Sequence, residues 1–364
     1  MLKGIKVIDF TNYLPGPFAT LRLAELGAEI IKVEPPEGDP ARHMGLSKQG
    51  NGLVFLANNR QKKSIILNLK EKDGYDTALK LIAHADVVLE SFRPGVMEKL
   101  GLGYEAVQKV KPDIVYCSIS GYGQKGLLSK LGNHDLNYMA LSGVLAQFKT
   151  KAGKPVHPSI TLGDYIGGFA ANERILAGLV SRTLTGNGSY HSISITDQLV
   201  SLLGNHVLVE QETGAGNGID VLSGSIVSYA LYETSDGRFM SFGALEPKFW
   251  ANFCQAHGRE EWIQAHYSTT TESNPVYLEL MALFKSKTFY EWIEFAHKVD
   301  CCMAPVLEIG ELVTNPYFRE KELVFASTWG DYQVKMHSDL KQESIAPPPQ
   351  KNEHNAEILN NILI

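Results

Sequence analysis

Cysteine is scarce in this chain of 364 residues: there are four, Cys117, Cys254, Cys301 and Cys302, and none form a CxxC pair. This spacing excludes a disulfide framework and argues against a structural zinc site. The chain also lacks a run of about 18 apolar residues, the length that a membrane span needs. Its first residues show no signal-peptide pattern. We therefore expect no bound metal, no membrane partner and a reducing, cytoplasmic location.

Positive charge is also in short supply. The chain holds 34 lysines and arginines against 40 acidic residues, a formal net charge of −6. A protein that binds nucleic acid along its backbone needs a basic face, so we expect no nucleic-acid partner. P-loop, HExxH and GxSxG motifs are absent from the sequence, and the eleven histidines are not spaced as metal ligands.

What the chain does have is a regular alternation of strand-like and helix-like segments. Strands are predicted over residues 5–10, 29–33, 64–69, 85–89 and 114–120, with helices over 17–26 and 74–83 between them. Such alternation predicts a mostly parallel sheet with helices on both faces. A long helix is predicted over 165–183 and a further strand over 192–196.

The pattern changes after about residue 200. Residues 213–224 are glycine-rich and predict a loop, and residues 228–243 predict a hairpin that turns at Asp236-Gly237. Residues 249–296 are mainly helical, and a short helix follows the three prolines at 347–349. The expected fold class is α/β: a large domain (1–199 and 326–364) with an open, mostly parallel Rossmann-like sheet, and a smaller α+β domain (200–325).

One motif points to a dinucleotide but lacks its context. Residues 121–126 fit GxGxxG and follow a predicted strand. No helix develops directly after them, and no acidic residue ends a neighbouring strand about 20 residues further on. We therefore disfavour a nicotinamide cofactor.

Several segments together resemble the superfamily of family III CoA-transferases (CaiB/BaiF) and 2-methylacyl-CoA racemases. The resemblance runs from residue 1 to about residue 360. The assignment to the superfamily depends on how many matching segments there are and on the order in which they occur. The blocks are residues 2–10, 26–34, 59–64 with 67–70, 85–95 and 120–124, together with 304–307 and 353–354.

Three features are similar to the racemase branch. Residues 133–143 place His134 where racemases have a histidine, residues 242–249 place Glu246 before a proline, and Pro15-Gly16-Pro17 follows the first strand. The chain departs from the racemase pattern at Asn133, where a glycine is usual, and lacks the usual glycine near Asn352.

The resemblance implies catalytic roles for His134, Asp164 and Glu246. Racemisation needs one group on each face of the α-carbon, and histidine together with a carboxylate of raised pKa can serve as the acid–base pair. Glu246 would hydrogen-bond His134 and set its tautomer or charge. Asp164 opens the long predicted helix, so we expect unpaired amides there and a close approach of the ligand at Gly167 and Gly168, which would stabilise the enolate oxygen.

The same resemblance implies a CoA site, with CoA entering as part of the acyl-CoA substrate and no separate cofactor. Arg93 and Lys99 suit phosphates, and Leu67 and Phe92 suit the adenine face. The full set of positions that match the family's CoA contacts is Leu67, Lys70, Ser91, Phe92, Arg93 and Lys99. The family also implies an interlocked homodimer.

Each residue also has an ordinary alternative role. Asp164 is typical of a helix N-cap, His134 of a polar loop, Glu246 of an exposed turn and Lys99 of a solvated surface. Two other functions stay open. In a CoA-transferase, Asp164 would be the nucleophile; in a binding protein without catalysis, acyl-CoA would bind and not react.

Overall fold

The computed structural model describes residues 1–150, 152–216, 218–339 and 345–362. The chain divides into two compact units. The first comprises Met1–Leu203 and Arg319–Ile364, and the second comprises Gly204–Phe318.

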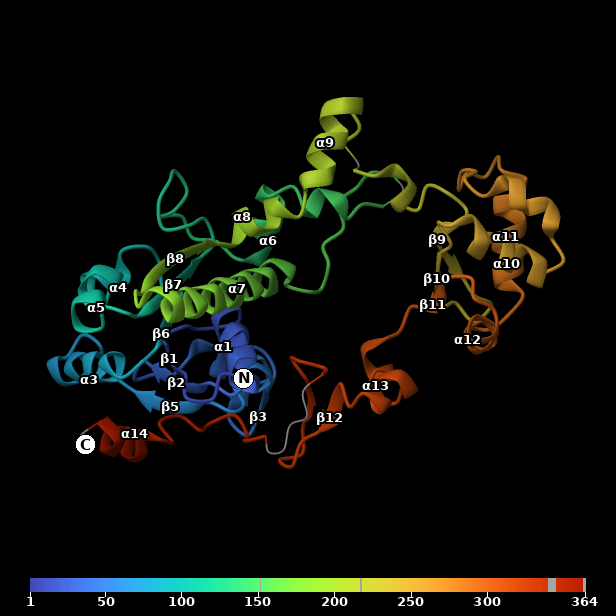
Figure 1. The fold of residues 1–364 in the computed structure, drawn as a ribbon. Helices are drawn as coiled ribbons and strands as arrows, with labels where there is room; N and C mark the ends of the chain where they lie inside the picture. Colours follow the sequence, from blue (N-terminus) through green and yellow to red (C-terminus); the bar gives the residue numbers. More distant parts are fainter. Residues whose placement is uncertain (151, 217, 340–344, 363–364) are drawn as a thin grey trace. The chain divides into compact units, whose positions relative to one another are not determined.

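A six-stranded sheet forms the centre of the first unit (Figure 1). All its pairings are parallel, which confirms the α/β class with a largely parallel sheet. The order across the sheet is β5 (Lys63–Ile66), β2 (Glu29–Glu34), β1 (Lys6–Asp9), β6 (Val87–Glu90), β7 (Val115–Ser120) and β8 (Ser189–Ser194). Since the chain moves outward in one direction from β1 and then in the other from β6, the order of strands reverses between these two neighbours.

Alternate residues of each strand supply two separate cores, one on each face of the sheet. Val7, Val87 and Cys117 belong to one core, and their neighbours Ile8, Val88 and Tyr116 belong to the other. These strands are therefore apolar on both faces, as expected of a parallel sheet between two helix layers.

Two helix layers cover the sheet. The first core is shared with α1 (Pro15–Glu25), α6 (Asp135–Leu141), α7 (Leu162–Thr185) and α8 (Ile195–Ser201). The second is shared with α3 (Lys72–Ala83), α4 (Val96–Lys99), α5 (Tyr104–Val110) and α14 (Asn355–Ile362). The unit also contains α2 (Leu53–Asn58) and two short hairpins, β3 (Ser47–Lys48) with β4 (Asn51–Gly52) and β12 (Val324–Ala326) with β13 (Tyr332–Val334).

The C-terminal segment packs back on the first unit through buried polar contacts. Arg60 forms a fully buried ion pair with Glu25, and its guanidinium also donates to the carbonyl of Val334 at 2.7 Å. Arg42 pairs with Glu34 at 2.7 Å and donates to the carbonyl of Pro349 at 3.2 Å. Charges buried in this way need partners, so these contacts fix where the segment lies.

The second unit is built around an antiparallel sheet and an aromatic core. Its sheet has the order β11 (Met303–Pro305), β10 (Phe239–Gly243), β9 (Tyr229–Glu233). The predicted hairpin with its Asp236-Gly237 turn is confirmed, and Gly237 adopts a φ of +75°. The helices are α9 (Gly204–Thr213), α10 (Pro247–Ala256), α11 (Pro275–Lys285), α12 (Phe289–Lys298) and α13 (Pro316–Glu320), the last ending in the first unit.

Two expectations differ from the structure. Over residues 192–196 the predicted strand is wrong at its end, because Ile195 begins α8 and the Ser194 hydroxyl caps it by accepting from the Asp197 amide at 3.3 Å. An unpredicted helix, α9, precedes the glycine-rich stretch 213–224 and ends at its first residue. Asn217, in that stretch, lies outside the described residues.

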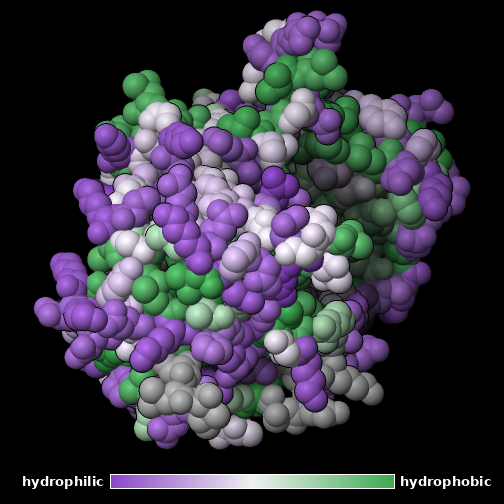
Figure 2. Space-filling model, turned by 60° about the vertical axis from the view of Figure 1, so that its left-hand side comes forward, coloured by the Kyte–Doolittle hydropathy of each residue, from purple (hydrophilic) through white to green (hydrophobic). Residues whose placement is uncertain are grey.

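Hydrophobic residues on the face drawn in Figure 2 lie interspersed with hydrophilic ones. In the described ranges, the structure contains no helix that is both long and apolar enough to cross a membrane.

Candidate active site

The reversal of strand order between β1 and β6 positions the candidate site. Connections leave these two neighbouring strands at their carboxyl ends and turn to opposite sides of the sheet, which leaves a crevice where ligands of open α/β proteins bind. Asn12 follows β1 and Phe92 follows β6, and both side chains line two cavities at this edge. Because they share these residues, the two cavities adjoin.

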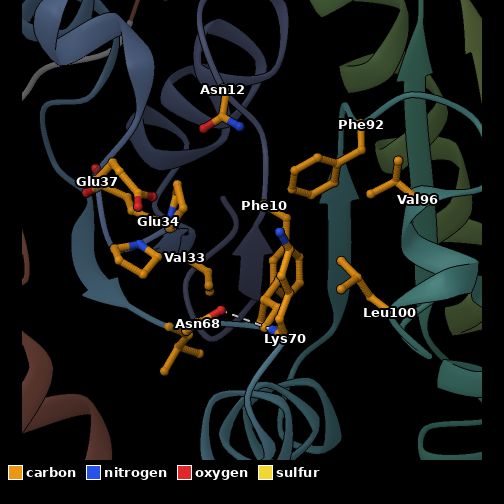
Figure 3. A pocket seen from close by; sticks show the side chains of 14 residues that line it. Phe10, Asn12, Val33, Glu34, Glu37, Asn68, Lys70, Phe92, Val96 and Leu100 are labelled. Atoms are coloured by element: carbon orange, nitrogen blue, oxygen red, sulfur yellow. Dashed lines mark hydrogen bonds between the residues drawn. The ribbon is translucent and has the colours of Figure 1, made fainter.

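The first cavity has a volume of about 350 Å³ and is bounded by the ends of β1, β2, β5 and β6. Figure 3 shows Phe92 and Leu100 on one side of it and Glu37 on the other. Leu67, Lys70 and Phe92, three of the predicted CoA contacts, line it. The amide of Lys70 donates to the Asn68 side chain at 3.2 Å, which holds the turn after β5.

The second cavity has a volume of about 590 Å³ and brings together most of the other predicted residues. His134 and Asp164 both line it, although 29 residues separate them along the chain. Ser91, Phe92 and Arg93 line it from the turn after β6. Lys99, in contrast, is exposed on α4 and lines neither cavity.

His134 stands directly before α6, at an exposed position on the cavity. Its amide donates to the Asn137 side chain at 3.0 Å, which anchors the start of the helix. The neighbouring Asn133 accepts a hydrogen bond from the Tyr138 hydroxyl at 2.6 Å and donates to the carbonyl of Leu131 at 2.9 Å. The imidazole therefore projects from a segment whose backbone is held on both sides.

Asp164 lies in the first turn of α7, two residues after the helix begins, and its side chain is largely buried. Burial, followed by the negative charge of Asp135, raises the pKa of the Asp164 carboxyl to about 7. A carboxyl group with such a pKa can both give and take a proton at neutral pH. This is the property that the proposed acid–base chemistry requires.

The amides at the start of α7, which were expected to be unpaired, are paired in the structure. The Asp164 amide donates to the Asp135 side chain at 3.0 Å and the Tyr165 amide to the carbonyl of Thr161 at 3.3 Å, so both are paired. Gly167 and Gly168 lie in the next turn, where helical amides donate to carbonyls one turn earlier.

Packing explains these two glycines instead. A Cβ on Gly167 would lie 2.8 Å from the Ile195 side chain, and one on Gly168 would lie 2.7 Å from Phe18 and 2.8 Å from the carbonyl of Pro15. They allow α7 to approach α8 and α1.

Glu246 belongs to the second unit, where it is the exposed residue before α10. Its hydrogen bond with His134 therefore stays a prediction. Within the described part of the chain, no group of three or more histidine, cysteine and acidic side chains is arranged to hold a metal ion.

The sequence reasoning missed the buried charges that shape the crevice. Lys32 pairs with Asp39 at 2.8 Å, and both side chains are fully buried. Lys32 also donates to the carbonyl of Thr11 at 2.7 Å, and Asp39 accepts from the amide of Tyr13 at 3.1 Å. These contacts fix the loop after β1, so that Asn12 faces the cavities. A lysine inside the apolar strand β2 was the available signal.

Known proteins resemble this chain in sequence and in fold. The sequence profile of CoA-transferase family III matches residues 2–355. Alpha-methylacyl-CoA racemase of Mus musculus is 33% identical over 325 residues, which cover 88% of this chain and 81% of that protein. Succinyl-CoA:glutarate CoA-transferase of Homo sapiens is 31% identical over 379 residues, which cover 100% of this chain and 86% of that protein.

Solved structures with a similar fold are known. The crystal structure of a CAIB/BAIF family protein from Brucella suis superposes with a TM-score of 0.86 at 24% sequence identity, covering 99% of both chains. Profile, relatives and fold agree over nearly the whole length, and we conclude that this chain belongs to CoA-transferase family III.

Proposed function

We propose that this protein is a racemase that interconverts (2R)- and (2S)-2-methylacyl-CoA. The observation that carries the proposal is the presence of His134 and Asp164 on the second cavity, which adjoins the first cavity with its predicted CoA contacts. The similarity to alpha-methylacyl-CoA racemase supports the same activity.

The proposed chemistry is a 1,1-proton transfer. One residue of the pair removes the α-proton as a base, the electron pair moves into the thioester carbonyl to give an enolate, and the other residue returns a proton to the opposite face. His134 and Asp164 exchange these roles between the two isomers. No electrons leave the substrate, so no redox partner takes part.

The substrate supplies its own CoA, and no further cofactor enters the proposal. Arg93 lines the second cavity and suits a phosphate, while Leu67 and Phe92 offer apolar surface for the adenine. A homodimer, with Glu246 accepting a hydrogen bond from His134, is also part of the proposal.

A CoA-transferase is the second candidate, favoured by the match of the whole chain to succinyl-CoA:glutarate CoA-transferase. In that reaction the Asp164 carboxylate would attack the thioester carbonyl, CoA would leave as the thiolate, and an acyl anhydride would form on Asp164. His134 would then have no chemical role.

His134→Ala separates the candidates, because it should leave CoA transfer largely intact, whereas Asp164→Ala should stop both reactions. Under our proposal, His134→Ala abolishes racemisation of 2-methylacyl-CoA, and Asp164→Ala does the same. The control is His84→Ala, which removes an exposed histidine just after α3, away from both cavities. If His134→Ala retains wild-type racemisation, the two-base proposal is refuted.

The wild-type protein distinguishes the alternatives as well. If it transfers CoA to a carboxylate acceptor and does not racemise, it is a transferase. If it binds acyl-CoA without turnover, it is a binding protein.

A further inference from the structure

Tyr13, in the loop between β1 and α1, has an unusual backbone conformation for an aromatic residue. Its φ is +65°, in the left-handed region that favours glycine because a Cβ there crowds the following carbonyl group. Six described residues other than glycine have a positive φ, and of these Tyr13 alone lines either cavity. The chain therefore places a bulky side chain on the second cavity at a position where glycine would fit the backbone better.

Polar groups from other elements hold the loop around Tyr13 in this conformation. The Tyr13 amide donates to Asp39 Oδ1 at 3.1 Å, and Asp39 is paired with the buried Lys32. One residue earlier, the Asn12 amide donates to the Ser91 hydroxyl at 3.3 Å. A strained backbone persists only where the surrounding structure fixes it, and here two successive amides are fixed from outside the loop.

The side chain of Tyr13 does not owe its place to the core. It is 47% exposed. In the described part of the chain its hydroxyl group makes no hydrogen bond, and its ring packs against no other aromatic ring or cation. Burial, the usual contribution of an aromatic side chain to stability, therefore does not explain it. What the ring does face is the open space of the second cavity.

The two cavities indicate which part of a ligand this ring meets. Asn12 lines both cavities, whereas Tyr13 lines only the second, together with His134 and Asp164. Leu67, a predicted contact of the adenine, lines only the first. Tyr13 is therefore on the side of the acyl group and the reacting carbon, away from the nucleotide.

We propose that Tyr13 is a specificity-determining residue, whose ring forms a wall of the acyl site and favours slender aliphatic 2-methylacyl groups over bulky aryl ones. The loop does not give way to a larger group, because Asp39 and Ser91 hold its amides. The activity readout of this proposal rests on the proposed racemase function.

Two variants separate the ring from the backbone and from the hydroxyl group. Tyr13→Gly removes the ring and suits the positive φ, so it should fold like the wild type. Tyr13→Phe keeps the ring and removes only the hydroxyl group.

The test measures kcat/KM for α-proton exchange with 2-methylbutanoyl-CoA and with 2-phenylpropanoyl-CoA, and compares the ratio of the two values among the variants. In Tyr13→Gly we expect the ratio to move at least about tenfold towards the aryl thioester, since a change of one methylene in an apolar site already has that effect. In Tyr13→Phe the ratio should stay that of the wild type, because the wall is still present.

The matched control is Gln49→Gly, which replaces an exposed residue with a φ of +50° that lines neither cavity. Both glycine variants should keep the urea midpoint of the wild type, and only Tyr13→Gly should change the ratio. A general loosening of the loop would lower both rates and leave their ratio unchanged. An unchanged ratio in Tyr13→Gly overturns the proposal, as does an equal shift in Gln49→Gly.

A second readout needs no turnover. Calorimetric titration gives the Kd of each thioester, and in Tyr13→Gly the aryl thioester should gain affinity relative to the aliphatic one. If the wild type exchanges no α-protons at all, the racemase proposal fails, and the ratio of the two Kd values still decides the role of Tyr13: an unchanged ratio overturns it.

Discussion

Replacing Lys32 by methionine tests the buried charges beneath the crevice. Lys32 is fully buried, pairs with Asp39 at 2.8 Å and donates to the carbonyl of Thr11 at 2.7 Å. Methionine keeps most of the stem but removes the cation, which leaves the Asp39 carboxylate buried without its partner. Removing one partner of a buried ion pair costs about 3–5 kcal/mol. We expect the free energy of unfolding of the first unit to fall by that amount.

The assay is urea denaturation followed by far-ultraviolet circular dichroism. Tryptophan fluorescence is less suitable, because three of the four tryptophans lie in the second unit: Trp250, Trp262 and Trp292. Lys72→Met, which removes an exposed ion pair with Asp76, serves as the control and should leave the midpoint unchanged. A loss below about 1 kcal/mol in Lys32→Met would refute the reasoning, because ordinary substitutions already cost that much.

Three further predictions concern the site. For the isomer that Asp164 deprotonates, the rate of α-proton exchange should fall about tenfold per pH unit below about 7, since the carboxyl group must be ionised to act as a base; a rate independent of pH from 5 to 8 would contradict this. Gly168→Ala should destabilise the first unit by about 1–3 kcal/mol in urea denaturation, because its Cβ would lie 2.7 Å from Phe18; an unchanged midpoint would contradict this. Arg93→Ala should raise the KM for acyl-CoA about tenfold in steady-state assays. If the KM rises equally for a substrate analogue that lacks the CoA phosphates, Arg93 does not bind them.

The fold followed largely from local signals in the sequence. The strands of the central sheet are short apolar runs that end at turns, and the Asp236-Gly237 turn specifies its own hairpin. Prediction was wrong at Ile195, since a buried isoleucine suits either a strand or the helix that begins there. The amides near Asp164 are paired and not free because the long helix begins at Leu162, earlier than predicted.

The candidate site was only partly predictable. The resemblance to a family identified His134 and Asp164, and the structure places both on one cavity. Nothing in the local sequence shows that Asp135 reaches across to α7, because the contact joins residues 29 positions apart. For the Lys32–Asp39 ion pair the available signal was a lysine inside the apolar strand β2, which does not by itself identify its partner.

The most direct test of the proposed function is proton nuclear magnetic resonance in heavy water, with purified protein and (2R)-2-methylacyl-CoA as the sole substrate. We predict loss of the α-proton signal and accumulation of the 2S isomer. Neither change should occur in the double variant that combines His134→Ala with Asp164→Ala. Retention of the α-proton by the wild type, under conditions where it binds the thioester, would contradict the racemase proposal.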